Sequence, residues 1–167
     1  MEMSTSMTDR EFEVMIFENQ ALIIKICSIY TSTDSDREDL FQEIVINLWN
    51  GINRFQGKSK LSTWIYRVGL NTAISRSRKV KTDKLQYTDS IPEQQWIPDE
   101  NHEQEIMALY KAIDLLNPTE KAIVILYLED KSYEEISEIV GISKSNISVK
   151  LVRLKRKLEQ LMRPKQG

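Results

Sequence analysis

"SYEEISEIVGISKSNISVKLVRLKRKLEQLM", residues 132–162, decides the fold of the C-terminal part of the chain. Ser132 begins a capping box, S-x-x-E, which predicts a short helix that ends before Gly141. Gly141 supplies a turn, and Ser143 can cap a longer helix that runs to about Met162. A short helix, a tight glycine turn and a longer basic helix predict a helix-turn-helix, although the same spacing also fits an antiparallel helix pair in a bundle.

The longer helix separates an apolar face from a face suited to duplex DNA. Projected at about 100° per residue, the core side holds Ile147, Leu151, Leu154, Leu158 and Leu161. On the opposite side, small hydroxyls suit base edges, valine methyls suit thymine methyls, and flanking cations such as Lys155 and Lys157 suit phosphates. The residues expected to contact DNA are Lys144, Ser145, Ser148, Val149, Lys150, Val152, Arg153 and Arg156. The alternative is that the lysines only coat a solvated surface helix.

Charge is segregated along the chain, although the total is only −2. Residues 1–53 carry a net charge of −7 and residues 54–84 a net charge of +8. Residues 85–142 carry −10 and residues 143–167 carry +7. Two separate basic blocks suggest two contacts on one polyanion.

Composition argues against several classes of protein. The single cysteine, Cys27, cannot form an internal disulfide and is expected to be a small buried hydrophobe, and the single histidine, His102, is expected to be exposed. We therefore expect no metal site, no cofactor and no enzyme activity. The longest apolar run, residues 122–128, is too short to span a membrane, and the N-terminus lacks the blocks of a signal peptide. The expected location is the cytoplasm, without membrane insertion.

The whole chain predicts an all-α fold of two small helical domains joined by a flexible linker. Apolar residues recur every three or four positions, glycine is scarce and strand-like alternation is missing. The linker is expected over 81–102, which is polar, lacks a period and contains two prolines. The expected N-terminal domain covers 10–80, with helical spacing over 11–30, helices at about 36–50 and 61–79, and a loop at 51–60. The expected C-terminal domain, 103–164, contains the helix-turn-helix, preceded by a helix that starts at the capping sequence Asn117-Pro118-Thr119-Glu120.

The helix at about 36–50 has an acidic outward face with an isoleucine at its centre. Its buried arc is expected to hold Leu40, Phe41, Ile44, Val45, Leu48 and Trp49. The outward arc holds Asp39, Gln42, Glu43 and Ile46. An apolar side chain among carboxylates suggests a protein partner with basic and apolar groups. A single stray exposed isoleucine is an equally good interpretation.

The next helix carries a basic strip between two apolar stripes. Lys60, Arg67, Asn71 and Arg78 align along it, and the loop before it holds Arg54, Phe55 and Lys58. Basic groups interleaved with aromatic rings suit single-stranded or opened DNA. Phe55 and Trp64 are alternatively core anchors, which is the preferred interpretation for Trp64.

Three stretches together resemble the bacterial RNA polymerase sigma factors of the extracytoplasmic-function (ECF) type, in the sigma-70 superfamily. They are DLFQE at 39–43 with Leu48-Trp49, RFQGKSKLSTWIYRVGLNTAISRSRK at 54–79, and LNPTEKAIVILYLEDKSYEEISEIVGISKSNISVKLVRLKRKL at 116–158. The motifs appear in the family's order and cover almost the whole chain outside the first ten residues and the linker. One departure lies in the reading helix, where Gly-Thr-Val-Lys-Ser-Arg is frequent in the family and residues 145–150 are Ser-Asn-Ile-Ser-Val-Lys.

The resemblance implies a sigma-two-like domain and a sigma-four-like domain that recruit core RNA polymerase to promoter DNA. By resemblance, Asp39, Gln42, Glu43 and Ile46 bind the beta-prime clamp helices, and the C-terminal domain also meets the beta flap. The loop and basic strip at 54–78 then open and read the −10 element, the last helix reads the −35 element, and the linker threads toward the active-site cleft. An anti-sigma factor is a further expected partner. The competing hypotheses are a stand-alone helix-turn-helix regulator and a helical adaptor whose basic patches only aid solubility.

Overall fold

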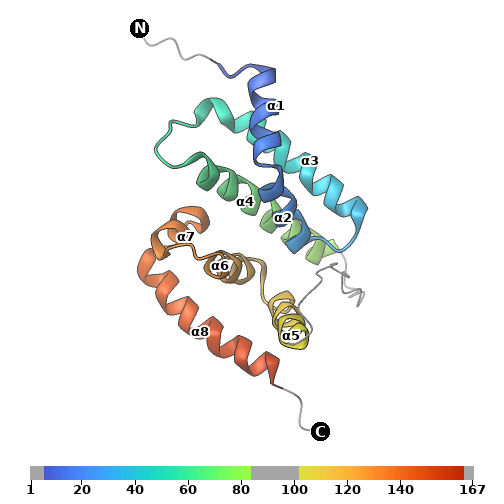
Figure 1. Cartoon of the computed structure of the whole chain (residues 1–167), viewed down its shortest axis with the longest axis vertical. Helices are drawn as coiled ribbons and strands as arrows, with labels where there is room; N and C mark the ends of the chain where they lie inside the picture. Colours follow the sequence, from blue (N-terminus) through green and yellow to red (C-terminus); the bar gives the residue numbers. More distant parts are fainter. Residues whose placement is uncertain (1–5, 84–101, 164–167) are drawn as a thin grey trace. The chain divides into compact units, whose positions relative to one another are not determined.

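The computed structural model describes residues 6–83 and 102–163, and within these ranges the regular elements are all helices. The all-α prediction is therefore confirmed (Figure 1). The chain divides into two compact units, residues 1–92 and residues 93–167. Most of the expected linker, residues 84–101, lies outside the described residues, whereas 81–83 form the last turn of a helix. None of the helices in the described part of the chain has the length and apolar character needed to cross a bilayer.

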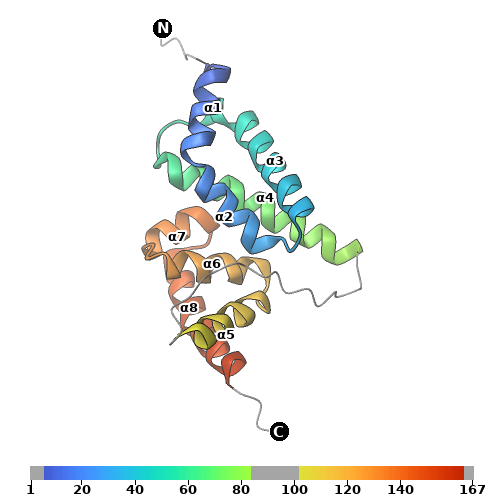
Figure 2. The same ribbon diagram turned by 45° about the vertical axis from the view of Figure 1, so that its right-hand side comes forward.

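The N-terminal unit is a small bundle in which one long helix packs against two others. Its elements are α1 (Asp9–Glu18), α2 (Gln20–Tyr30), α3 (Asp34–Gly51), a short 3-10 helix η1 (Ile52–Arg54) and α4 (Leu61–Asp83). Helix α4 packs on both α2 and α3, and Figures 1 and 2 show these three helices side by side. The fully buried core holds Ile23, Ile26, Leu40, Ile44, Leu48 and Ile65.

The helical stretch expected over 11–30 is two helices that meet at Asn19. Its backbone leaves the helical region (φ −109°, ψ 12°), and its side-chain Nδ2 donates to the carbonyl oxygen of Met15 at 2.9 Å. Asparagine competes in this way with the regular backbone hydrogen bonds of a helix. The apolar period continues across the break, which is why periodicity alone did not locate it.

A glycine permits the close crossing of α2 and α4. A Cβ atom added to Gly69 would lie 2.8 Å from Cδ1 of the buried Ile26. Real Cβ contacts are longer, so a larger residue here would force the buried Ile26 side chain to shift within the core between α2 and α4. On α3, the prediction that Trp49 is buried is wrong, since 42% of it is exposed. Its ring packs edge-on against Phe12 with centroids 4.9 Å apart.

The C-terminal unit contains α5 (Glu103–Asp114), α6 (Pro118–Leu128), α7 (Tyr133–Val140) and α8 (Lys144–Met162). Its caps are those read from the sequence: the backbone N–H groups of Glu120, Glu135 and Asn146 donate to Asn117, Ser132 and Ser143. Gly141 ends α7 in the left-handed conformation (φ 79°). Helices α7 and α8 pack on each other, and α8 also contacts α5 and α6. The helix-turn-helix is therefore confirmed.

Helix α6 ends in a common type of helix terminus that contains one residue in a strained conformation, and this residue allows a prediction about stability. The N–H of Lys131 donates to Leu126 and that of Asp130 to Tyr127, both at 3.1 Å, which are the two bonds of a Schellman motif. Asp130 occupies the left-handed position (φ 60°) that glycine adopts without strain. We expect Asp130→Gly to raise the free energy of unfolding by about 0.5–1 kcal/mol, measured by urea unfolding followed by circular dichroism.

Asp130→Ala is the control, because alanine keeps the Cβ that opposes positive φ and should lower the free energy of unfolding. A destabilised Asp130→Gly protein would contradict the prediction and would assign a stabilising contact to the Asp130 carboxylate.

Candidate protein and nucleic-acid interfaces

Helix α8 presents one apolar face to the core and the opposite face to solvent. Exposure rises along the inner face from 0% at Ile147 to 9% at Leu158, and reaches 40% at Leu161. The core therefore thins out toward the end of α8, and the prediction that Leu161 is buried is wrong. On the outer face, Val149 is 49% and Val152 51% exposed. The remaining residues expected to contact DNA are also exposed, apart from the half-buried Ser148: Lys144, Ser145, Lys150, Arg153 and Arg156.

Three lysines of α8 have partners inside the C-terminal unit. Lys157 Nζ lies 3.1 Å from Glu120 Oε2, and Lys144 Nζ lies 3.6 Å from Glu134 Oε1. The ammonium of Lys155 lies over the Tyr127 ring, 4.5 Å from its centroid, and its contact with Tyr127 raises the pKa of Lys155. The Lys144 pair is highly exposed and therefore weak.

The Lys157 pair is part of a network that fixes α8 on α6. Asn117 Nδ2 donates to Glu120 Oε1 at 2.8 Å, while Glu120 N–H donates back to Asn117 Oδ1 at 2.8 Å. The second carboxylate oxygen of Glu120 accepts from Lys157. One glutamate therefore joins the N-terminal cap of α6 to the basic helix. This role leaves Lys157 engaged within the protein and weakens the expectation that it reaches a phosphate.

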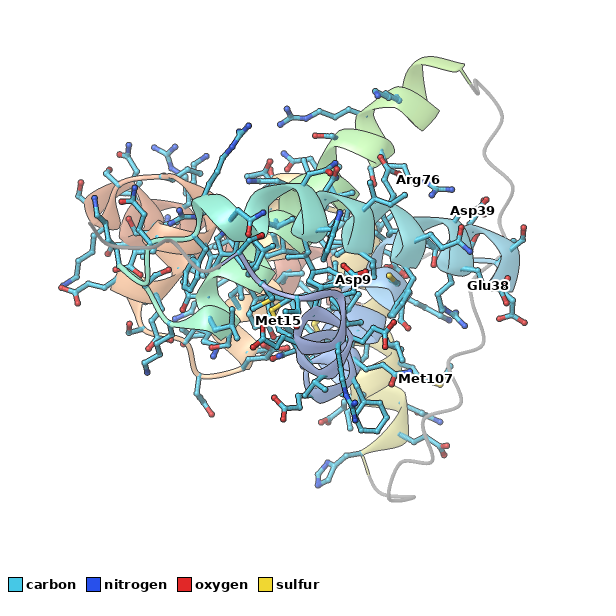
Figure 3. The ribbon with its side chains drawn as sticks, turned by 90° about the horizontal axis from the view of Figure 1, so that it is seen from above. Asp9, Met15, Glu38, Asp39, Arg76 and Met107 are labelled. Carbon is cyan, nitrogen blue, oxygen red and sulfur yellow. The ribbon has the colours of Figure 1, made fainter. Side chains whose placement is uncertain are left out.

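The outward face of α3 has the orientation that the sequence predicts. Its four expected residues, Asp39, Gln42, Glu43 and Ile46, are all exposed. Ile46 is 57% exposed, so a large apolar side chain does stand among the carboxylates. Figure 3 shows Asp39 on the side of α3 that Arg76 of α4 approaches.

Arg76 is a residue of this surface that the sequence analysis missed. Its guanidinium lies 3.6 Å from Asp36, 3.9 Å from Asp39 and 3.8 Å from Glu43, and its side chain is 24% exposed. Nine positions separate Arg76 from Arg67, so the two arginines lie on opposite faces of α4. The sequence carries no signal for this role, because it depends on which face of α4 packs toward α3.

The basic strip of α4 is exposed along its length. Lys60, Arg67, Asn71 and Arg78 are exposed, as are Arg54 and Lys58 in the preceding segment. Phe55 is half-buried and its ring centroid lies 5.2 Å from that of Trp64. Trp64 also approaches Gly51, where an added Cβ would lie 3.2 Å from its ring. These contacts favour the anchoring interpretation for both aromatic rings.

A polar contact joins the two helices that carry the acidic and basic surfaces of the N-terminal unit. Asn47 Nδ2 of α3 donates to Thr72 Oγ1 of α4 at 2.9 Å, and Thr72 Oγ1 donates to the carbonyl of Val68 at 2.7 Å. With the packing of α3 on α4, this contact sets the position of the strip relative to the α3 face. The α3 face and the helical part of the strip, Arg67, Asn71 and Arg78, therefore lie on two packed helices, whereas Lys58 and Lys60 lie in the loop before α4.

The two residues that could have suggested other chemistry have ordinary surroundings. Cys27 is fully buried, as predicted, and burial raises its pKa to about 11, against the opposing charges of Arg37 and Arg76. Its thiol is therefore protonated at neutral pH. His102 is exposed, as predicted, with Nδ1 3.7 Å from Glu105 Oε2.

Comparison with known proteins gives matches over both units. The family model for Sigma-70 region 2 matches residues 15–82, and that for Sigma-70, region 4 matches residues 106–158. The ECF RNA polymerase sigma factor SigX of Bacillus subtilis is 29% identical over 121 residues, covering 66% of this chain and 62% of SigX. SigW of the same organism is 26% identical over 155 residues, covering 84% of this chain and 83% of SigW. SigG of Mycobacterium tuberculosis is 26% identical over 167 residues, but only 45% of it is covered.

Two solved structures share the fold. The sigma factor RpoE from Bartonella quintana, in complex with the anti-sigma factor NepR, aligns with a TM-score of 0.71 and 19% identity over 94% of this chain and 99% of RpoE. CnrH in complex with the cytosolic domain of CnrY aligns with a TM-score of 0.65 and 16% identity over 95% of this chain and 92% of CnrH. At this identity the likeness concerns the fold, which is that of the two helical units described above.

Proposed function

We infer that this chain, which belongs to the sigma-70 family as a sigma factor of the ECF type, binds core RNA polymerase and directs transcription from specific promoters. It contains regions 2 and 4 of that family. Because the chain spans less than two thirds of SigX and SigG, its own partners and activity are proposed here from its surfaces.

The observation that carries the proposal is the outer face of α8. Val149 and Val152 are exposed among hydroxyls and cations on α8, the second helix of the helix-turn-helix. This arrangement is suited to the major groove. We assign this face to the −35 element. The C-terminal domain, 103–164, would also meet the beta flap of the polymerase.

The N-terminal domain, 10–80, is assigned to the polymerase and to the −10 element. The exposed acidic face of α3, with Ile46 at its centre, suits the basic and apolar side chains of a helical partner, which we take to be the beta-prime clamp helices. The exposed strip of α4 suits the backbone of an opened strand. We still assign Phe55 to this surface, where the contact of its ring with Trp64 supports the loop.

Regulation by an anti-sigma factor is part of the proposal. Of the two fold neighbours, RpoE was solved in complex with the anti-sigma factor NepR, and CnrH in complex with the cytosolic domain of CnrY. On the basis of the same family, we propose that the protein is a regulatory protein that acts in the cytoplasm and is not an enzyme. The linker 81–102 is proposed to join the two promoter contacts, and residues 84–101 of it lie outside the described part of the chain.

Transcription with purified core RNA polymerase tests the proposal. We expect the protein to support promoter-specific initiation on genomic DNA, and sequencing the RNA 5′ ends should give start sites preceded by two shared elements. Core polymerase alone is the control. Failure to initiate at any promoter would contradict the proposal, and tight binding to a palindromic site without polymerase would instead identify a stand-alone helix-turn-helix regulator.

A further inference from the structure

Three carboxylates on one face of α3 lie 3.6–3.9 Å from the guanidinium of Arg76. Asp36, Asp39 and Glu43 are spaced by three and four residues, so their side chains are neighbours on the helix surface. Like charges at this spacing repel one another. Arg76, from α4, places one terminal nitrogen near Asp36 and Asp39 and the other near Glu43. The forked guanidinium can serve both sides of the cluster at once.

The contacts of Arg76 with the three carboxylates are longer than hydrogen bonds. At 3.6–3.9 Å they are ion pairs rather than hydrogen bonds of normal length. The carboxylates remain 48–63% exposed, while the Arg76 side chain is only 24% exposed. By contrast, Arg37 holds Asp34 in a hydrogen-bonded pair at 3.0 Å. The acids of the cluster can therefore reach an incoming partner, whereas the cation that balances them is largely covered.

Most of the Arg76 side chain is covered by the protein. Its charge acts on the fully buried Cys27 of α2, where it opposes the effect of burial on the thiol. The helix that carries Arg76, α4, packs on both α2 and α3. Because only 24% of its side chain is exposed, Arg76 has less freedom than a surface arginine to move away from the carboxylates when a partner approaches.

We propose that Arg76 is an internal counter-ion of the polymerase-binding face and limits its attraction for basic partners. This inference rests on the proposed function, because it concerns the same contact between α3 and a basic surface of core polymerase. A lysine or arginine of the partner competes with Arg76 for Asp39 and Glu43. Arg76 therefore sets the strength and the salt dependence of the contact without touching the partner's apolar groups.

The direct test replaces the cation and measures binding of the full chain to core polymerase over a range of salt. Arg76→Gln is expected to tighten binding by about three- to tenfold at low salt and to make it more salt-dependent, because one positive charge leaves the acidic face. Arg76→Lys keeps the charge, so its affinity for core polymerase should be closer to that of the wild type than to that of Arg76→Gln. Unchanged or weaker binding of a folded Arg76→Gln protein would overturn the proposal.

Asp39→Asn with Glu43→Gln, measured in the same series, separates this inference from the proposed function. If that pair weakens binding while Arg76→Gln does not tighten it, the counter-ion role fails and the docking face stands. If the acid substitutions have no effect, the docking face itself fails.

Should Arg76→Gln not fold, Asp36→Asn gives a second test with Glu38→Gln as its control. Both substitutions remove one exposed acid from α3, and of these two acids it is Asp36 that pairs with Arg76 in the described part of the chain. Asp36→Asn leaves Arg76 to Asp39 and Glu43, so it should weaken polymerase binding more than Glu38→Gln. Equal effects of the two substitutions would overturn the proposal.

Discussion

Replacing Asp39 and Glu43 together with alanine is expected to weaken binding to core RNA polymerase by about 10- to 100-fold. Both side chains are exposed on α3 and leave the core residues Leu40, Ile44 and Leu48 untouched. The substitution removes two of the three carboxylates near Arg76, so the largely covered guanidinium then repels a basic partner. Fluorescence anisotropy of the labelled protein with core polymerase measures the loss.

The matched control is Glu13→Ala with Glu38→Ala. These exposed acids belong to the same unit, so the net charge changes equally while the face that carries Ile46 is kept. We expect a loss of less than about threefold, as is usual for charges outside a contact. Equal losses in the two pairs would mean that net charge alone attracts the polymerase, and circular dichroism melting curves check that both proteins are folded.

The local signals of the sequence located the helices of the C-terminal unit well. Capping residues and Gly141 mark the limits of α6, α7 and the start of α8, because these groups act on backbone atoms two or three residues away. Periodicity likewise predicted that Ile46 and Val149 face outward. No start signal distinguished α5, which begins after His102 without a side-chain cap.

What the sequence could not predict depends on contacts between helices. Arg76 meets the acids of α3 only because α4 crosses that helix, and Lys157 meets Glu120 only because α8 packs on α6. The exposure of Leu161 depends on where the core of the unit ends. A helical projection gives the direction of a side chain and not what lies opposite it, so the candidate site residues were identified by face while their ion-pair partners were not.

Arg153→Ala with Arg156→Ala is expected to lower the affinity of the polymerase complex for promoter DNA by about 30- to 300-fold and to reduce the salt slope by about two. Both arginines are exposed on the outer face of α8, opposite the buried Leu151 and Leu154. Competition binding to a promoter identified from the RNA 5′ ends measures affinity at several salt concentrations.

Lys155→Ala with Lys157→Ala is the matched comparison, since it removes two cations from the same helix. Tyr127 and Glu120 hold these lysines, so their loss should change the salt slope by less than about one. It should instead lower the stability of the C-terminal unit, because Glu120 would no longer join α6 to α8. If the lysine pair reduced the salt slope as much as the arginine pair, the phosphate contacts would have to extend around α8, and the DNA would approach from the Tyr127 side rather than over Val149 and Val152.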